Sequence, residues 1–355
     1  METDKDDEPI NTKFEQILKS KYTLVVSIIL FGFAYIFQRF FSELDEAFIA
    51  VVLRNDLMRP VADPFWLIMF WPTVAIFFLS ITVYFVFSNN RSTALAMLAI
   101  VVLGGLFLGD ALKSVFDLPR PPQSFSDWVP AIYESFIPTT AETNDFPAQS
   151  VLVPAAFCTY FYLKNPSKKR GIFFIIYVIL MFFARPYIGV NHISASIAGT
   201  IIGIYTGLIV YEYTGQVRVL SIFDSKIKKL LISLGFFLLM FIIYWLQRPL
   251  FHTRPAQGVD LDIRMFMIVL GGFLGLSITD YPKQLNFEVN EASNKLRFYG
   301  SILVCYIILF AIYFLTLILP EGLLWLGIII GFIDGLWISI GGPRIVEMIN
   351  KDIKL

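Results

Sequence analysis

Long apolar runs separated by short polar loops dominate the chain. A helix that crosses a bilayer needs roughly 20 mainly apolar residues, and ten runs approach or reach this length. They cover residues 23–41, 65–87, 93–112, 149–163, 171–184, 193–213, 228–246, 264–279, 298–319 and 322–340. Backbone groups cannot stay unpaired in lipid. The pattern therefore predicts an all-α integral membrane protein with ten spans, or nine if one of the last four is re-entrant.

Polar stretches divide the chain into four predicted parts. Residues 1–22 form a polar tail, 23–214 a six-span core, 228–340 a four-span C-terminal extension and 341–355 a second tail. Lysines and arginines are concentrated in the first tail and in the loops after the fourth, sixth and eighth spans. The positive-inside rule therefore places both termini in the cytoplasm. The loops with Lys113, Arg120 and Arg185 then face the lumen or the outside.

Composition narrows the possible functions. The chain is 57% hydrophobic and 16% charged, whereas a soluble domain has roughly a quarter charged residues. The 28 acidic residues balance the 28 lysines and arginines, which argues against a nucleic-acid partner. Cys158 and Cys305 both lie in apolar runs, so we expect packed thiols. Without a Cys/His cluster we expect neither a metal nor another cofactor.

A basic segment at the end of the third run is the first candidate site. Lys113 precedes Arg120-Pro121 by seven residues, at a predicted membrane edge. Two neighbouring cations repel each other unless an anion lies between them, and an arginine offers a planar fork for phosphate oxygens. The alternative is that both side chains snorkel to the membrane surface. A third cation, Arg185, lies at the start of the sixth span on the same predicted face.

These segments, together with residues 146–150, resemble the type 2 phosphatidic acid phosphatase superfamily. The run 108–122 is most similar to the sphingosine-1-phosphate phosphatase branch, and the resemblance covers residues 65–213. It implies a six-helix lipid-phosphatase-like core in which three cations bind phosphate. Two neutral side chains and the backbone N–H groups at the start of the fourth helix add donors. The implied phosphate-binding residues are Lys113, Arg120, Arg185, Gln149 and Ser150.

The catalytic positions of the family are changed in this chain. Ser150 stands where the family has the histidine that protonates the leaving group. Asn191 occupies the position of the nucleophilic histidine, and Ala195 that of the aspartate that orients it. The resemblance therefore implies a pseudo-phosphatase that binds a phosphorylated lipid without efficient hydrolysis. Its expected partners are membrane lipids, in the endoplasmic reticulum of a eukaryote or the cell membrane otherwise; no protein partner is indicated.

Two histidines leave an enzymatic alternative open. His192 lies one residue after the family position and is the candidate for a displaced nucleophile. A nucleophilic histidine needs a partner for its other ring nitrogen. At the family spacing this partner falls at Ser196, which has no carboxylate. The simpler interpretation makes His192 an interfacial polar residue. His252 is either a general acid recruited from its loop or a solvated residue.

A third hypothesis is lipid or ion transport on this fold. Four spans beyond the core exceed what a hydrolase requires. Asp334 lies in the last span, where an ionisable residue is costly and often functional. It marks either a polar path through the membrane or a packed, hydrogen-bonded carboxyl group.

Overall fold

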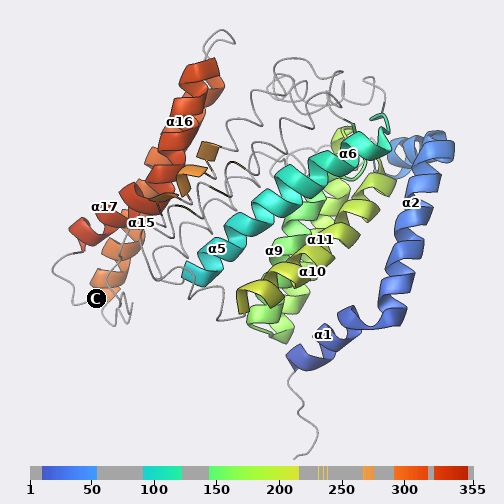
Figure 1. Ribbon diagram of the computed structural model, residues 1–355, viewed down its shortest axis with the longest axis horizontal. Helices are drawn as coiled ribbons and strands as arrows, with labels where there is room; N and C mark the ends of the chain where they lie inside the picture. Colours follow the sequence, from blue (N-terminus) through green and yellow to red (C-terminus); the bar gives the residue numbers. More distant parts are fainter. Residues whose placement is uncertain are drawn as a thin grey trace, which may run out of the picture. The chain divides into compact units, whose positions relative to one another are not determined.

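The structure is a computed structural model in which all secondary structure is helical over the residues described (Figure 1). The described residues are 10–53, 91–121, 144–215, 231, 235, 238, 267, 268, 270–272, 274, 275, 292–318 and 324–350. Among them, four helices are long and apolar enough to cross a membrane: Lys21–Val51, Lys168–Tyr187, Ile193–Thr214 and Leu326–Ile349. The all-α membrane class is confirmed. The division into six and four spans stays a prediction, and the run 65–87 lies outside the described residues.

The chain folds into two compact units. Unit 1 comprises Met1–Thr73 and Ala99–Gly215, and unit 2 comprises Val74–Leu98 and Gln216–Leu355. The three segments that resemble phosphatase motifs all belong to unit 1, whereas Asp334 belongs to unit 2.

The N-terminal half is built from helices that largely follow the apolar runs. Helix α2 kinks at Phe41, at the predicted end of its run, and its polar end beyond the kink is bonded to another helix through the buried Asp45. The elements are α1 (Ile10–Lys19), α2 (Lys21–Phe48), η1 (Ile49–Leu53), α5 (Arg91–Ile100), η2 (Val101–Gly109), α6 (Asp110–Phe116), α9 (Gln149–Lys164), α10 (Lys168–Ile188) and α11 (Ile193–Gly215).

Helix α11 is the central element of unit 1 and packs against α9, α2 and α10. Its contact with α9 is close because a row of glycines faces the carbonyl groups of α9. A Cβ atom added at any of them would lie within 2.4 Å of a carbonyl oxygen. Small residues allow such close backbone contact in membrane helices. The glycines are Gly199, Gly203 and Gly207. As a result the starts of α9 and α11 are adjacent, and Ala148 N–H donates to the Ala195 carbonyl at 3.0 Å.

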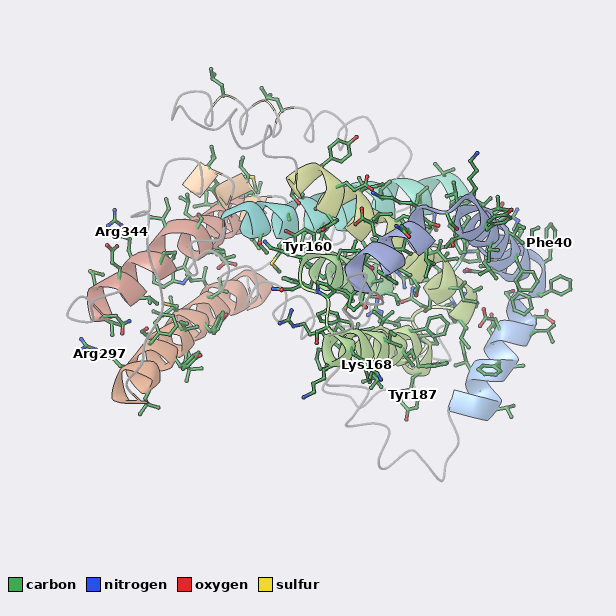
Figure 2. The ribbon with its side chains drawn as sticks, turned by 90° about the horizontal axis from the view of Figure 1, so that it is seen from below. Phe40, Tyr160, Lys168, Tyr187, Arg297 and Arg344 are labelled. Atoms are coloured by element: carbon green, nitrogen blue, oxygen red, sulfur yellow. The ribbon has the colours of Figure 1, made fainter. Side chains whose placement is uncertain are left out.

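Large apolar side chains cover the outer faces of α2 and α10. Phe40, which projects from α2 in Figure 2, is 72% exposed, and Phe173 and Ile175 of α10 are also exposed. Soluble monomers rarely expose apolar patches of this extent. These faces therefore have the character of lipid-facing surfaces.

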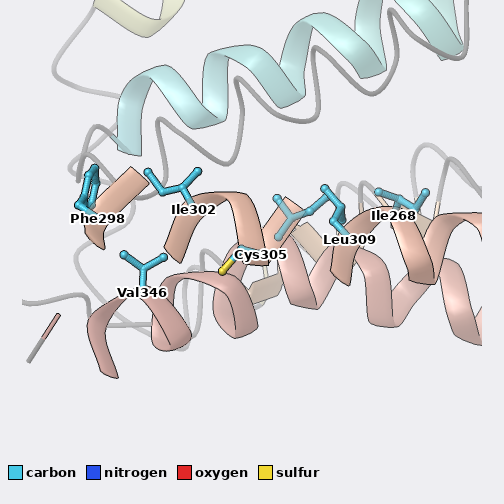
Figure 3. Close-up of a cluster of buried hydrophobic side chains, with 7 residues drawn as sticks. Ile268, Phe298, Ile302, Cys305, Leu309 and Val346 are labelled. Atoms are coloured by element: carbon cyan, nitrogen blue, oxygen red, sulfur yellow. The ribbon is translucent and has the colours of Figure 1, made fainter. Parts of the chain in front are cut away.

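The C-terminal helices of unit 2 pack around one apolar cluster. The elements are α15 (Ala292–Ile318), α16 (Leu324–Leu336), η6 (Trp337–Gly341) and α17 (Gly342–Ile349). Figure 3 shows Val346 beside Phe298 and Ile302 of α15 in this cluster. The apolar pattern predicts that the last helical stretch ends at residue 340, but it continues to Ile349. The buried apolar positions of α17, which pack on α15, explain the extension.

Candidate functional site

The chain turns sharply between the two cations of the first motif. Helix α6 ends at Asp117, which adopts a left-handed conformation with φ of 47°. Asn144 fixes this turn by donating its side-chain N–H groups to the Asp117 carboxylate at 2.7 Å and to the Lys113 carbonyl at 3.1 Å. Asp145 N–H donates to the Leu118 carbonyl at 2.9 Å. The segment before α9 therefore holds the Lys113–Arg120 segment in place.

The side chain of Lys113 reaches from α6 to the start of α9, where the sequence predicts neutral hydrogen-bond donors. Its ammonium group is buried and donates to Gln149 Oε1 at 3.2 Å, while Gln149 Nε2 donates to the Gly105 carbonyl. The Ser150 hydroxyl is buried without a hydrogen-bond partner among the described residues. Ala148 caps α9 without a side-chain hydrogen bond. The first N–H groups of a helix lack intrahelical acceptors, so this end is suited to an anion.

The two arginines reach the same short loop from different parts of the chain. Arg120 donates to the Val190 carbonyl, and Arg185 donates from Nε to Asn191 Oδ1 at 3.0 Å. Gly189 ends α10 with φ of 81°, a conformation that glycine adopts without strain, and so turns the chain back towards Arg185. The second and third cations of the predicted cradle are thus adjacent.

A buried aspartate, Asp145, is the centre of the site. One carboxylate oxygen accepts a hydrogen bond from the Asn191 side chain. The other accepts from the His192 backbone N–H at 2.8 Å and from Gln38 Nε2 at 2.9 Å, and lies 2.7 Å from His192 Nδ1. Burial raises the pKa of Asp145, but the hydrogen bond and charge of His192 and the charge of Arg120 outweigh it. The pKa is therefore below its ordinary value, and Asp145 is ionised at neutral pH.

Carboxylates lie on both sides of the His192 ring. Its Nε2 is 3.5 Å from Glu46 Oε1, on the side away from Asp145. Nearby, Asp45 accepts from the backbone N–H groups of Ile193 and Ser194 at 2.9 and 3.0 Å, and so caps α11. Burial lowers the pKa of His192, but hydrogen bonding and charge from Asp145 raise it above its ordinary value. The surroundings therefore favour the imidazolium.

His192 is enclosed by the protein, with only 1% of its side chain exposed. Its ring also has a carboxylate partner, which comes from Asp145 and not from the helix that follows. Ser196, the position at the family spacing, donates to the His192 carbonyl at 3.4 Å. A partner from a distant segment has no fixed spacing from the histidine, so the spacing argument missed it.

Residues of α2 in the site were not predicted. Gln38 donates to Asp145, and its Oε1 accepts from the Ser194 hydroxyl at 3.3 Å. Asp45 and Glu46 belong to the polar end of the helix, which resembles an ordinary span boundary. One available signal was the position of Asp145 directly before Phe146-Pro147, at the second motif segment. For α2 the signal was weaker: the buried Gln38 interrupts an apolar run.

The structure brings most predicted site residues into one connected network. Asp145 and the loop 189–192 link the two arginines to Asn191 and His192. The side chains of Lys113 and Ser150 lie next to this loop, at the start of α9. Ala195 contributes its backbone carbonyl to that junction. His252 lies outside the described residues. Among the described residues, no cluster of three or more His, Cys, Asp or Glu side chains has the arrangement of a metal site.

Comparison with known proteins agrees with the motifs. Residues 93–218 match the family model of the PAP2 superfamily. The match extends from α5 to just beyond α11 and includes Lys113, Arg120, Arg185 and residues 146–150. The resemblance to this superfamily is therefore confirmed for this part of the chain, and the sphingosine-1-phosphate branch stays a prediction. No curated protein and no solved structure matches the chain.

Proposed function

We propose that this protein binds the phosphorylated head group of a membrane lipid and does not hydrolyse it efficiently. Lys113, Arg120 and Arg185 supply the positive charge, and Ser150 with the first N–H groups of α9 supplies neutral donors. The binding face is the luminal or outer face of the membrane, opposite the cytoplasmic termini. The lipid is a phosphate monoester, as the PAP2 superfamily match and the lipid-facing helices of unit 1 suggest.

The observation that carries this proposal is the meeting of two arginines at one loop. Arg120 and Arg185 donate to neighbouring residues, Val190 and Asn191, although they come from separate segments. The carboxylate whose charge acts on both arginines is Asp145, and it also bonds His192 and Gln38. A dianionic phosphate would accept charge-assisted hydrogen bonds from these cations.

The surroundings of His192 argue against efficient hydrolysis. A histidine nucleophile attacks phosphorus with the lone pair of an unprotonated nitrogen. Two carboxylates favour the imidazolium of His192, which lacks that lone pair. Glu46, next to Nε2, would also repel an approaching phosphate. Asn191, at the family position of the nucleophile, has an amide that is held between Arg185 and Asp145.

Binding of a long-chain alkyl phosphate to the detergent-solubilised protein tests the proposal. Arg120 is the best position to change because it is only partly buried. Arg120→Ala removes charge-assisted hydrogen bonds worth about 1.5–3 kcal/mol, so affinity should fall about tenfold or more. Arg120→Lys keeps the charge but lacks the planar fork, so its affinity should lie between those of the wild type and Arg120→Ala.

Arg170 provides a matched control for that experiment. It lies on α10, at the opposite end of the helix from Arg185, and donates to the Asn165 carbonyl at 2.7 Å. Arg170→Ala should leave the affinity for the alkyl phosphate unchanged. Equal affinity of wild type and Arg120→Ala would contradict the proposal. An equal loss in both arginine variants would point to non-specific charge attraction and would contradict it as well.

The second candidate function is lipid-phosphate hydrolysis by His192. It is favoured by the 2.7 Å contact between His192 Nδ1 and Asp145, which fixes the ring and its tautomer. It predicts release of inorganic phosphate from a lipid phosphate, abolished by His192→Ala and increased by Glu46→Gln. Phosphate release that is absent from the wild type over a range of alkaline pH values would exclude it.

A further inference from the structure

Asp334 is the most deeply buried acidic side chain described in unit 2. It lies in α16, inside the segment Leu326–Ile349 that is long and apolar enough to cross a membrane. The side chain is 0% exposed, and neither carboxylate oxygen has a hydrogen-bond partner within the part of the chain that the structure describes. The sequence left open a packed, hydrogen-bonded carboxyl group; the side chain is packed, but no such bond is present among the described residues.

The residues that follow Asp334 on its helix are apolar and closely packed. The next residue, Gly335, packs against the segment around Gly271. A Cβ atom added at Gly335 would lie 2.0 Å from the Ile268 carbonyl oxygen. One turn later, Ile338 belongs to the apolar cluster that also contains Leu309 of α15; Figure 3 labels Leu309 in this cluster. An ionised carboxylate without a partner is very costly in such a place, so the group takes up a proton.

The charged groups on neighbouring elements do not compensate Asp334. On α17, Arg344 pairs with Glu347 at 3.2 Å. On α15, the described charged side chain is Arg297, which is exposed near the start of the helix. The titratable Cys305 donates to the Gly342 carbonyl at 3.4 Å. Asp334 forms no hydrogen bond with any of these described groups.

A purely structural role does not explain this residue. Even a neutral carboxylic acid leaves its O–H donor and its carbonyl oxygen unsatisfied here, whereas leucine would fill similar space without polar atoms. The helix also changes to a π-helical turn at Trp337–Gly341, shortly after Asp334. Such turns interrupt the regular backbone ladder and occur often at functional sites. The retained carboxyl group and the altered helix therefore point to chemistry in the span.

We propose that Asp334 is a proton-binding site of unit 2, separate from the phosphate site of unit 1. In the closely packed form of α16 the carboxyl group holds the proton. When the packing of α16 opens to water, the O–H bond breaks, the proton passes to water and the electron pair stays on the carboxylate. The ligand is a proton, and the site gives unit 2 the means to couple a conformational change to proton uptake and release.

Infrared spectroscopy of the full-length protein in liposomes tests this proposal. The spectrum of Asp334→Asn, subtracted from that of wild type, should reveal a carbonyl band of a protonated carboxylic acid. The band should disappear in one transition as the pH rises, and should shift when water is replaced by deuterium oxide. Asp334→Glu should restore a titrating band, which separates loss of the proton site from a folding defect.

Three outcomes would overturn the assignment. A band absent at every pH would mean that Asp334 is ionised and has a partner. A band that neither shifts in deuterium oxide nor disappears before the protein unfolds would mean a permanently neutral acid. A band that remains in Asp334→Asn would belong to another residue. None of these measurements depends on lipid-phosphate binding, and Arg120→Ala should leave the band unchanged.

Discussion

Two buried aspartates, one in each unit, have opposite surroundings. Asp145 of unit 1 receives hydrogen bonds from three side chains and one backbone N–H group, and the charges of His192 and Arg120 favour its ionised form. Asp334 of unit 2 has no hydrogen-bond partner within the described residues. The same residue type therefore acts as an ionised structural centre in one unit and as a protonated group in the other.

This difference shows how burial alone misleads. Burial raises the pKa of any carboxyl group, but local charges and donors decide whether the charged form survives. The carboxylate of Asp145, in the loop before α9, connects this loop to α2 and to the start of α11. Removing its charge should therefore disturb several segments at once, whereas neutralising Asp334 should disturb almost nothing.

The largest effect is expected for Asp145→Asn. The change leaves His192 and Arg120 without their shared counter-charge in a buried site, and breaking a buried ion pair typically costs about 3–5 kcal/mol. The free energy of unfolding in detergent, measured by equilibrium denaturation, should fall by about this amount. A loss below about 1 kcal/mol would mean that Asp145 does not hold the candidate site of unit 1 together.

The His192–Asp145 pair should make the stability of unit 1 depend on pH. The pKa of His192 is raised, so its contribution is complete below about 6.5 and is lost as pH rises through the folded value. The pKa of Asp145 is lowered, so its contribution is present above about 3.9 and is lost as pH falls through the folded value. His192→Gln should therefore cost most between these two pH values, about 1.5–3 kcal/mol, and less in alkaline solution.

Glu46→Gln is the matched comparison for that measurement. Glu46 faces the other ring nitrogen at 3.5 Å and is partly exposed, so its loss should lower the pKa of His192 only slightly. Unfolding curves collected from acidic to alkaline pH give the dependence for each variant. A cost of His192→Gln that is the same at every pH would show that the pKa of His192 is the same in the folded and unfolded protein.

The sequence alone predicts the cations of the candidate site but not the acids that lie among them. Lys113 and Arg120 share one short segment, and a fixed spacing identifies them. Asp145 and His192 are paired only through the fold, because the contact depends on the close crossing of α9 and α11 at Gly199. No local pattern contains this information. The apolar runs likewise predicted the helices but not the π-helical turns, which depend on tertiary packing.

The polar end of α2 teaches the same lesson about helix boundaries. The apolar run ends near residue 41, where Phe41 leaves helical geometry and kinks the helix, and a polar helical segment then continues to Phe48. Hydropathy measures transfer into lipid and does not detect a carboxylate that caps another helix. The apolar pattern therefore ends the span before Asp45, although this side chain is 3% exposed and bonded to α11.

A smaller effect is expected for Asp45→Ala. The change removes the acceptor for the N–H groups of Ile193 and Ser194, and loss of such a cap typically costs about 1–2 kcal/mol. Glu43→Ala is the control, because Glu43 is exposed on the same helix. The free energies of unfolding of the two variants should differ by this amount. Equal stability would mean that water or another group caps α11 as well as Asp45 does.

The smallest effect is expected for Asp334→Asn, which mimics the protonated acid. Because Asp334 has no bonded partner among the described residues, the free energy of unfolding should change by less than about 0.5 kcal/mol. Asp334→Leu removes the unsatisfied polar atoms and should be neutral or stabilising. A cost of several kcal/mol for Asp334→Asn, comparable to that of Asp145→Asn, would mean that Asp334 is ionised and paired. The contrast between the two aspartates would then be lost, and with it the reason to place proton binding in unit 2.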